Sequence, residues 1–202
     1  MILIENYCVS GLASAIRGMR NPMNSWAKSD SYPTDTEYHI GANDKRLMQA
    51  LALNGSVHAK YRRMIVVYTD ITAPLYWWKE FDTYKVGTVA NSCSTMHKIH
   101  AKEFEPIDFS HENLNSGSYA VLSMVIDALN EARQEFIISK DKEAWWQMIQ
   151  LLPSSYNQKR TVMLNYEVLA NIYKSRRDHK LDEWRTFCEW IENLPYSEII
   201  TI

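Results

Sequence analysis

Three segments of the 202-residue sequence place polar or charged side chains where core packing does not require them. The first is the run SVHA, in which His58 precedes YRRMIVVYTDI, a β-branched and aromatic segment typical of a buried strand. A histidine at the entrance of a strand could contact a bound ligand, or it could have only a surface or capping role. The residue types alone leave both interpretations open.

The second segment is a loop of small and hydroxyl-bearing residues, TVANSCST, which follows Tyr84 and Lys85 and contains Cys93 and Ser94. Hydroxyl groups, an amide and free backbone N–H groups can hold a phosphate or hydrogen-bond a planar base. Loops of this composition also form plain turns. Both alternatives stay open at this point.

The third segment runs from Asn171 to Arg185 and is rich in charge. Arg176 falls at the end of one predicted helix and Arg185 near the start of the next, so a tight connection could bring them together. Two guanidinium groups could then grip one phosphate bidentately. A solvated charge run at a helix end is the alternative. Three such segments in succession favour a ligand site.

The elements that must position these residues are mostly helical. Apolar side chains at helical spacing predict helices from Asp44 to about Gly55 and from Pro74 onward, then over 119–136, 144–152, 162–173 and 181–191. A strand is expected over 61–71, and the polar stretch 21–41 is predicted to be a long loop. The expected fold is a single α+β domain, 1–202, with few strands.

Composition excludes several classes of protein. The net charge of -2 gives no uniform positive field for nucleic acid or an anionic membrane. No apolar run approaches the roughly 20 residues that span a bilayer, and the N-terminal residues lack a signal-peptide pattern. A cytoplasmic protein is therefore expected.

Metal and redox chemistry find little support in the sequence. Three widely spaced cysteines disfavour disulfide and zinc sites. The set His97, His100 and Glu103 is a weak metal signal beside a hydrated helix face, and no metal is predicted. Hydrolase elbow, Walker and Rossmann patterns are absent.

The order of the segments resembles the flavin-dependent thymidylate synthase (thymidylate synthase complementing protein) family. In that family a histidine within E-H-A precedes a strand, a Pro-led helix ends in R-H-R, a serine follows, and a late helix reads roughly L-x-N-F-x-x-L-R before a downstream Q-W-E-I-R. Here SVHA, the Pro74-led helix, the serine loop, LANIYKSR and HKLDEWR stand at those places. R-H-R is replaced by Thr83-Tyr84-Lys85. The family serine matches Ser94 with one inserted residue, or Cys93 without it.

The resemblance implies a mostly helical α+β fold with a small antiparallel sheet, assembled as a homotetramer with FAD sites between subunits. It implies a transferase of nucleotide biosynthesis, a flavoprotein that reductively methylates dUMP with FAD, NADPH and methylenetetrahydrofolate. By position, His58, Tyr84, Lys85 and Asn171 would face FAD. Glu80, Arg176 and Arg185 would hold the nucleotide, and Ser94 or Cys93, with Arg185, would lie at the reacting pyrimidine.

Two other functions compete with this one. The first is a non-catalytic member of the same scaffold that binds a nucleotide or a partner protein after losing the R-H-R arginines. The second is a helical interaction protein with no small-molecule site. Binding of FAD and dUMP would distinguish them, because a ligand that binds only the folded state raises the melting temperature.

Overall fold

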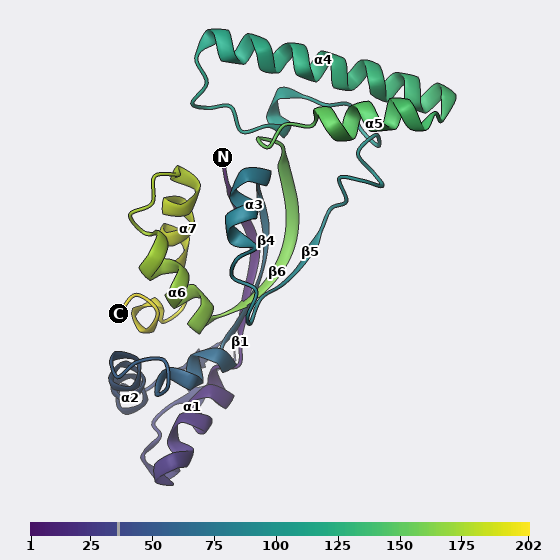
Figure 1. Ribbon diagram of the computed structural model, residues 1–202. Helices are drawn as coiled ribbons and strands as arrows, with labels where there is room; N and C mark the ends of the chain where they lie inside the picture. Colours follow the sequence, from purple (N-terminus) through teal and green to yellow (C-terminus); the bar gives the residue numbers. More distant parts are fainter. Residues whose placement is uncertain (36) are drawn as a thin grey trace. The chain divides into compact units, whose positions relative to one another are not determined.

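The structure is a computed structural model that describes residues 1–35 and 37–202. The described residues form the helices α1 (Leu12–Arg20), α2 (Ala42–Leu53), α3 (Leu75–Phe81), α4 (Ser116–Ser139), α5 (Lys142–Leu151), α6 (Tyr166–Arg176) and α7 (Asp182–Glu192). The strands are β1 (Leu3–Ser10), β2 (Tyr32–Pro33), β3 (Tyr38–His39), β4 (Val66–Pro74), β5 (Val89–Ser92) and β6 (Asn157–Asn165). The prediction of a mostly helical α+β fold is confirmed (Figure 1).

The strands form one small sheet in the order β1-β4-β6-β5, beside a separate β2-β3 pair. The amide of Tyr166 donates to the carbonyl of Ile65 at 3.0 Å, and the amide of Leu75 donates to the carbonyl of Tyr156 at 3.0 Å. From the first bond to the second, the residue number rises on the β4 side and falls on the β6 side. The two strands are therefore antiparallel. The small antiparallel sheet implied by the resemblance is confirmed.

The described chain divides into two compact units. Unit 1 comprises 1–3, 71–83 and 91–160, and unit 2 comprises 4–70, 84–90 and 161–202. The chain passes from one unit to the other within β1, β4, β5 and β6 and between residues 83 and 84. A single domain over 1–202 stays a prediction.

In unit 1, α4 and α5 pack side by side as a helical hairpin (Figure 1). Leu122, Ile126 and Leu129 of α4 share a buried cluster with Met148 of α5. These residues belong to the two stripes that the sequence predicted, so both helices are confirmed. The side chains of Asn115 and Asp141 cap the two N-termini, each accepting from a backbone amide in the first turn.

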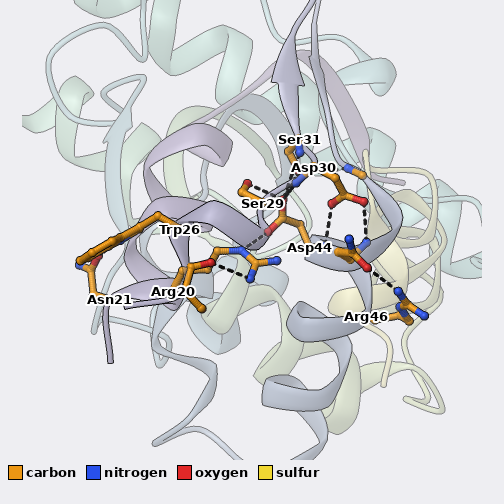
Figure 2. A network of polar contacts seen from close by, with 11 residues as sticks. Arg20, Asn21, Trp26, Ser29, Asp30, Ser31, Asp44 and Arg46 are labelled. Carbon is orange, nitrogen blue, oxygen red and sulfur yellow. Dashed lines mark hydrogen bonds and ion pairs between the residues drawn. The ribbon is translucent and has the colours of Figure 1, made fainter. Parts of the chain in front are cut away.

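In unit 2, a carboxylate organises much of the stretch that was predicted to be a loop. Asp44 on α2 is completely buried and accepts hydrogen bonds from Arg20 Nε at 2.6 Å and from the hydroxyls of Ser29 and Ser31 at 2.7 Å each (Figure 2). Burial alone would raise the pKa of Asp44, but the donors from Ser31, Ser29 and Arg20 hold it below its usual value. The loop therefore fastens α1 to α2.

The same stretch also caps α2 from outside the helix. The two carboxylate oxygens of Asp30 accept from the backbone amides of Asn43 at 2.8 Å and Asp44 at 3.1 Å (Figure 2). This replaces the local side-chain cap that Gly41 cannot provide. The predicted loop 21–41 is thus ordered by α2 and contains β2 and β3, while its residue Thr36 lies outside the described residues.

Two sequence-based boundaries are wrong. The apolar stripe read as a helix from Val162 includes the end of β6, and α6 begins only at Tyr166, where Asn165 accepts from the Val168 amide at 3.0 Å. The strand expected from Tyr61 starts at Val66, because 59–64 form a 3₁₀ helix, η3. Over a short segment, the spacing of apolar side chains can match both the helical period and the strand period.

Candidate functional site

A second charged group of unit 2 lies around Arg176, the last residue of α6. Its Nε donates to the hydroxyl of Tyr84 at 2.9 Å. Its guanidinium carbon lies 4.8 Å from the ring centroid of Trp184 and 5.8 Å from that of Tyr84. Trp184 is completely buried in α7, so the ring is a fixed platform. The geometry holds a planar cation against two aromatic rings.

Arg185 lies one turn into α7 and binds the connection between the two helices. Its Nη1 donates to the carbonyl of His179 at 2.9 Å and to that of Lys180 at 3.3 Å, while Nη2 pairs with Asp182. Its side chain is 47% exposed. The connection brings both arginines to one end of the helix pair, and their close approach to each other stays a prediction. Their joint grip on one anion stays a prediction.

The connection itself, 177–181, is short and locally satisfied. The amide of His179 donates to the carbonyl of Arg176 at 3.0 Å, and His179 Nδ1 accepts from the amide of Leu181 at 3.2 Å. Asp182 and Glu183 then occupy the first turn of α7, where negative charge is favoured by the helix dipole. Sequence and helix electrostatics together fix where α7 starts and hence where Arg185 lies.

The segment 84–90 is fastened to the start of α6. Gly87 has φ +82°, and a Cβ atom there would lie 2.6 Å from the side-chain nitrogen of Asn165, the residue that caps α6. Only glycine combines this backbone conformation with so close an approach. The absence of a side chain at Gly87 therefore lets the segment that carries Tyr84 and Lys85 pack closely against the start of α6. The Lys85 side chain is exposed, as is Asn171 on α6.

The predicted residues Cys93 and Ser94 belong to unit 1. The amide of Cys93 donates to the carbonyl of Lys159 at 2.9 Å, and the carbonyl of Cys93 accepts from Gln158 Nε2 at 2.7 Å. The Ser94 hydroxyl accepts from the amides of Met96 at 3.2 Å and His97 at 2.9 Å. Four residues of the loop, Val89–Ser92, form β5, and Cys93 and Ser94 follow it with exposed side chains.

Glu80, also in unit 1, lies on α3. Its backbone carbonyl accepts from the Thr83 amide at 3.1 Å and from the Thr83 hydroxyl at 2.7 Å, which ends the helix. Thr83, Tyr84 and Lys85 therefore lie beyond α3 and not on it. The sequence expected them at the end of the helix.

His58 occupies a different part of unit 2. It precedes η3 (Ala59–Met64) and lines a cavity of about 700 Å³ between α1, α2 and η3. Among the described residues, no hydrogen bond joins its side chain to Tyr84 or Arg176. The structure thus brings Tyr84 and Arg176 into contact but leaves His58 with other neighbours.

The donor set of unit 2 fits an anionic nucleotide better than a metal ion. Arg176, Arg185 and Lys85 are cations, and Tyr84 presents a ring, which together suit phosphate groups and planar bases. Within 1–35 and 37–202, no group of three or more His, Cys, Asp or Glu side chains could hold a metal ion. No helix in the same ranges has the length and apolar character needed to cross a membrane.

Comparison with known proteins addresses the fold directly. The chain resembles a crystal structure of flavin-dependent thymidylate synthase ThyX from Helicobacter pylori complexed with FAD and dUMP, with 19% identity and a TM-score of 0.69 over 99% of this chain and 96% of that one. A second ThyX structure from Helicobacter pylori, also with FAD and dUMP, gives 18% identity and a TM-score of 0.68 over 99% and 95%. The sequence matches no protein-family model and no curated protein.

The protein therefore has the fold of the flavin-dependent thymidylate synthases along almost its entire length. The predicted resemblance is confirmed at this level. The roles of the individual residues stay predictions.

Three residues of the candidate site did not emerge from the sequence. The Trp184 ring packs against the Arg176 guanidinium, and Asp182 pairs with Arg185. The Asn165 side chain lies against Gly87. A tryptophan adjacent to a predicted ligand arginine was a usable signal, because guanidinium groups stack on indole rings. The contact between Gly87 and Asn165 had no sequence signal, since 78 positions separate the two residues.

Proposed function

We propose that the protein is a divergent flavin-dependent thymidylate synthase that reductively methylates dUMP, or a related pyrimidine nucleotide, with FAD, NADPH and methylenetetrahydrofolate. The observation that carries the proposal is the match along 99% of the chain to an enzyme solved with FAD and dUMP. The placement of Tyr84 and Arg176 supports it, because a cation fixed against two rings suits a nucleotide.

Each residue has a proposed role. Tyr84, Lys85, Asn171 and His58 bind FAD, where Tyr84 offers a ring and Lys85 a positive charge. Arg176 and Arg185 bind the phosphate or base edge of the nucleotide, and Glu80 contacts the base. Ser94 or Cys93 lies beside the pyrimidine. When bound, FAD would carry reducing equivalents from NADPH, while these side chains hold and orient the substrates.

The assembly is proposed to be a homotetramer in the cytoplasm. Exposed apolar side chains on α4 support an oligomer, because Val121 and Met124, three residues apart on the helix, are 60% and 70% exposed. Exposed apolar side chains at helical spacing are typical of helix pairing between subunits.

A second candidate function is a non-catalytic nucleotide-binding protein on the same scaffold. It is favoured by the replacement of R-H-R by Thr83-Tyr84-Lys85, which removes two bidentate cations from the cofactor site. The existing bonds of Arg185 to Asp182 and to two backbone carbonyls also reduce the donors that it can offer to a ligand.

One experiment distinguishes the two functions. Purified protein is incubated with FAD, NADPH, methylenetetrahydrofolate and dUMP, and dTMP is measured by mass spectrometry. Formation of dTMP that requires all four compounds supports the enzyme. Binding of dUMP without dTMP or NADPH oxidation supports the non-catalytic protein, and absence of both FAD and dUMP binding contradicts both.

A further inference from the structure

The loop that follows β5 is held at Cys93 by a buried amide of β6. Gln158 is 8% exposed, and its Nε2 donates to the carbonyl of Cys93 at 2.7 Å. The amide of Cys93 donates to the carbonyl of Lys159 at 2.9 Å. Both polar groups of the Cys93 backbone are therefore satisfied by β6, so the loop leaves the sheet at a defined point.

The side chain of Gln158 is itself oriented by Arg160, two residues further along β6. Arg160 donates from Nε to Gln158 Oε1 at 3.0 Å and from Nη1 to the carboxylate of Asp82 at 2.8 Å. Its guanidinium carbon lies 4.2 Å from the ring centroid of Trp78, which is 1% exposed. Trp78 Nε1 in turn donates to the Gln158 carbonyl at 2.9 Å. A buried ring and a carboxylate thus fix the guanidinium.

The chemistry of these groups permits only one orientation of the Gln158 amide. A guanidinium can only donate hydrogen bonds, and a backbone carbonyl can only accept them. The amide oxygen must therefore face Arg160, and the amide nitrogen must face Cys93. A reversed amide would place donor against donor at one end and acceptor against acceptor at the other. A change at Arg160 should consequently reach the Cys93 backbone through Gln158.

The rest of the loop, residues 93–97, is held by contacts of its own. Trp145 Nε1 on α5 donates to the carbonyl of Met96 at 3.0 Å. The hydroxyl of Ser94 accepts from the amides of Met96 and His97. The side chains of Cys93 and Ser94 nevertheless stay exposed. A loop with a fixed backbone and accessible side chains suits a ligand that must be held in one orientation.

We infer that Gln158, oriented by Arg160, is a positioning residue that holds the 93–97 loop in the conformation that binds the pyrimidine nucleotide. The inference rests on the proposed function, which places Ser94 or Cys93 beside the pyrimidine. Gln158 acts through the loop and makes no contact with the nucleotide in this role. All of these contacts lie within unit 1.

Gln158→Glu tests the inference, because glutamate keeps the size of the side chain and accepts from Arg160 but cannot donate to the Cys93 carbonyl. Hydrogen exchange of the amides of 93–97, followed by mass spectrometry, should become about tenfold or more faster, while exchange in α4 and α5 stays unchanged. The affinity for dUMP should fall by about tenfold or more. The affinity for FAD, measured without dUMP, should stay the same, because its proposed ligands belong to unit 2.

Two further variants complete the experiment. Gln134→Glu makes the same change at an exposed position of α4 and should alter neither the exchange of 93–97 nor the dUMP affinity. Arg160→Met removes the donor that orients Gln158 but keeps an unbranched apolar stem beside Trp78. It should also accelerate exchange in the 93–97 loop, and it provides the test if Gln158→Glu does not fold. Melting temperatures check the folding of each variant.

Three results would overturn the inference. The first is exchange of 93–97 that is unchanged in the folded variant, and the second is faster exchange with unchanged dUMP affinity. The third is an equal loss of FAD and dUMP affinity with a lowered melting temperature, since this indicates general destabilisation. A natural sequence that binds no dUMP would instead be a failure of the proposed function. The exchange of Gln158→Glu would still decide whether Gln158 holds the loop.

Discussion

The side chain of Arg176 donates from Nε to the hydroxyl of Tyr84, at 2.9 Å, across 92 positions of sequence. The bond joins the end of α6 to the segment that stands where the family has R-H-R. Tyrosine there holds the nearby arginine in place, in addition to presenting a flat surface. Tyr84 therefore sets the position of Arg176, the arginine that the resemblance places at the end of the L-x-N-F-x-x-L-R segment.

Replacement of Arg176 by lysine should weaken dUMP binding by about tenfold or more, because lysine keeps the charge but loses the planar fork that stacks on Trp184. The matched control is Arg177→Lys, since Arg177 is 58% exposed and its Nε bonds to the adjacent Asp178. Calorimetric titration of each variant with dUMP measures the difference. Equal affinities for the two variants would remove Arg176 from the site.

Removal of the Arg185 side chain should abolish the dUMP-dependent rise in melting temperature. Arg185→Ala should itself cost only about 0–1 kcal/mol of stability, because the ion pair with Asp182 is exposed to solvent. Asp182→Asn is the informative partner variant. It removes the carboxylate that competes for Arg185, so dUMP binding should tighten. A dUMP-dependent shift that survives in Arg185→Ala contradicts the assigned role.

The conformation of the 84–90 segment should depend on Gly87. Gly87→Ala is expected to destabilise the fold and to weaken FAD binding, because a Cβ atom would meet the capping side chain of Asn165. Gly55→Ala is the control, since Gly55 also has positive φ, +90°, but a Cβ there meets no atom within 4 Å. Both variants share a backbone cost of about 1–2 kcal/mol.

Loss of the α6 cap adds about 1 kcal/mol for Gly87→Ala only. Denaturant unfolding and FAD titration of both variants measure these effects. If Gly55→Ala lowered the free energy of unfolding and the FAD affinity as much as Gly87→Ala does, the contact between Gly87 and Asn165 would not explain the effect.

Three of the helices follow from the sequence because their apolar stripes are long and regular. The stripes of α4, α5 and α7 each cover several turns, which fixes both their period and their buried face. The sheet was harder to predict, since β1 has six exposed residues among eight and shows no alternating apolar pattern. Strand pairing depends on partners distant in sequence, so β1, β5 and β6 were not predicted.

In the candidate site too, contacts between residues close in sequence were predictable and contacts between distant residues were not. Arg176 and Arg185 belong to one continuous stretch whose helix ends are readable, so their place at one end of the α6–α7 pair was predictable. The partners of Arg176 were not, because Tyr84 arrives from a distant segment. The network around Asp44 shows the same limit, since a polar loop gives no sign that a buried carboxylate will order it.

Asp44→Asn should destabilise the protein by about 3 kcal/mol at neutral pH, because it removes the partner of the buried Arg20 guanidinium. The folded state lowers the pKa of Asp44 below 3.8, so its stabilisation is present above that value and is lost as pH falls through the folded pKa. Urea unfolding at several pH values compares the variant with the natural sequence. The difference between them should shrink in acid. A constant difference would contradict this assignment.

The three cysteines should differ in reactivity. Burial raises the pKa of Cys188 to about 12, whereas Cys8 and Cys93 are exposed. Iodoacetamide at mildly alkaline pH should therefore alkylate Cys8 and Cys93 and leave Cys188 unmodified, as measured by peptide mass spectrometry. Saturating dUMP should protect Cys93, with Cys8 as the internal control. Equal labelling of Cys93 with and without dUMP would argue against its proposed place beside the pyrimidine.

Thermal unfolding of the purified protein with FAD, with dUMP, with both and with neither tests the central proposal most directly. FAD and dUMP should each raise the melting temperature, and both together should raise it further, because each binds only the folded state. A melting temperature that stays unchanged at saturating concentrations of both compounds would contradict a flavin-dependent nucleotide site in this protein.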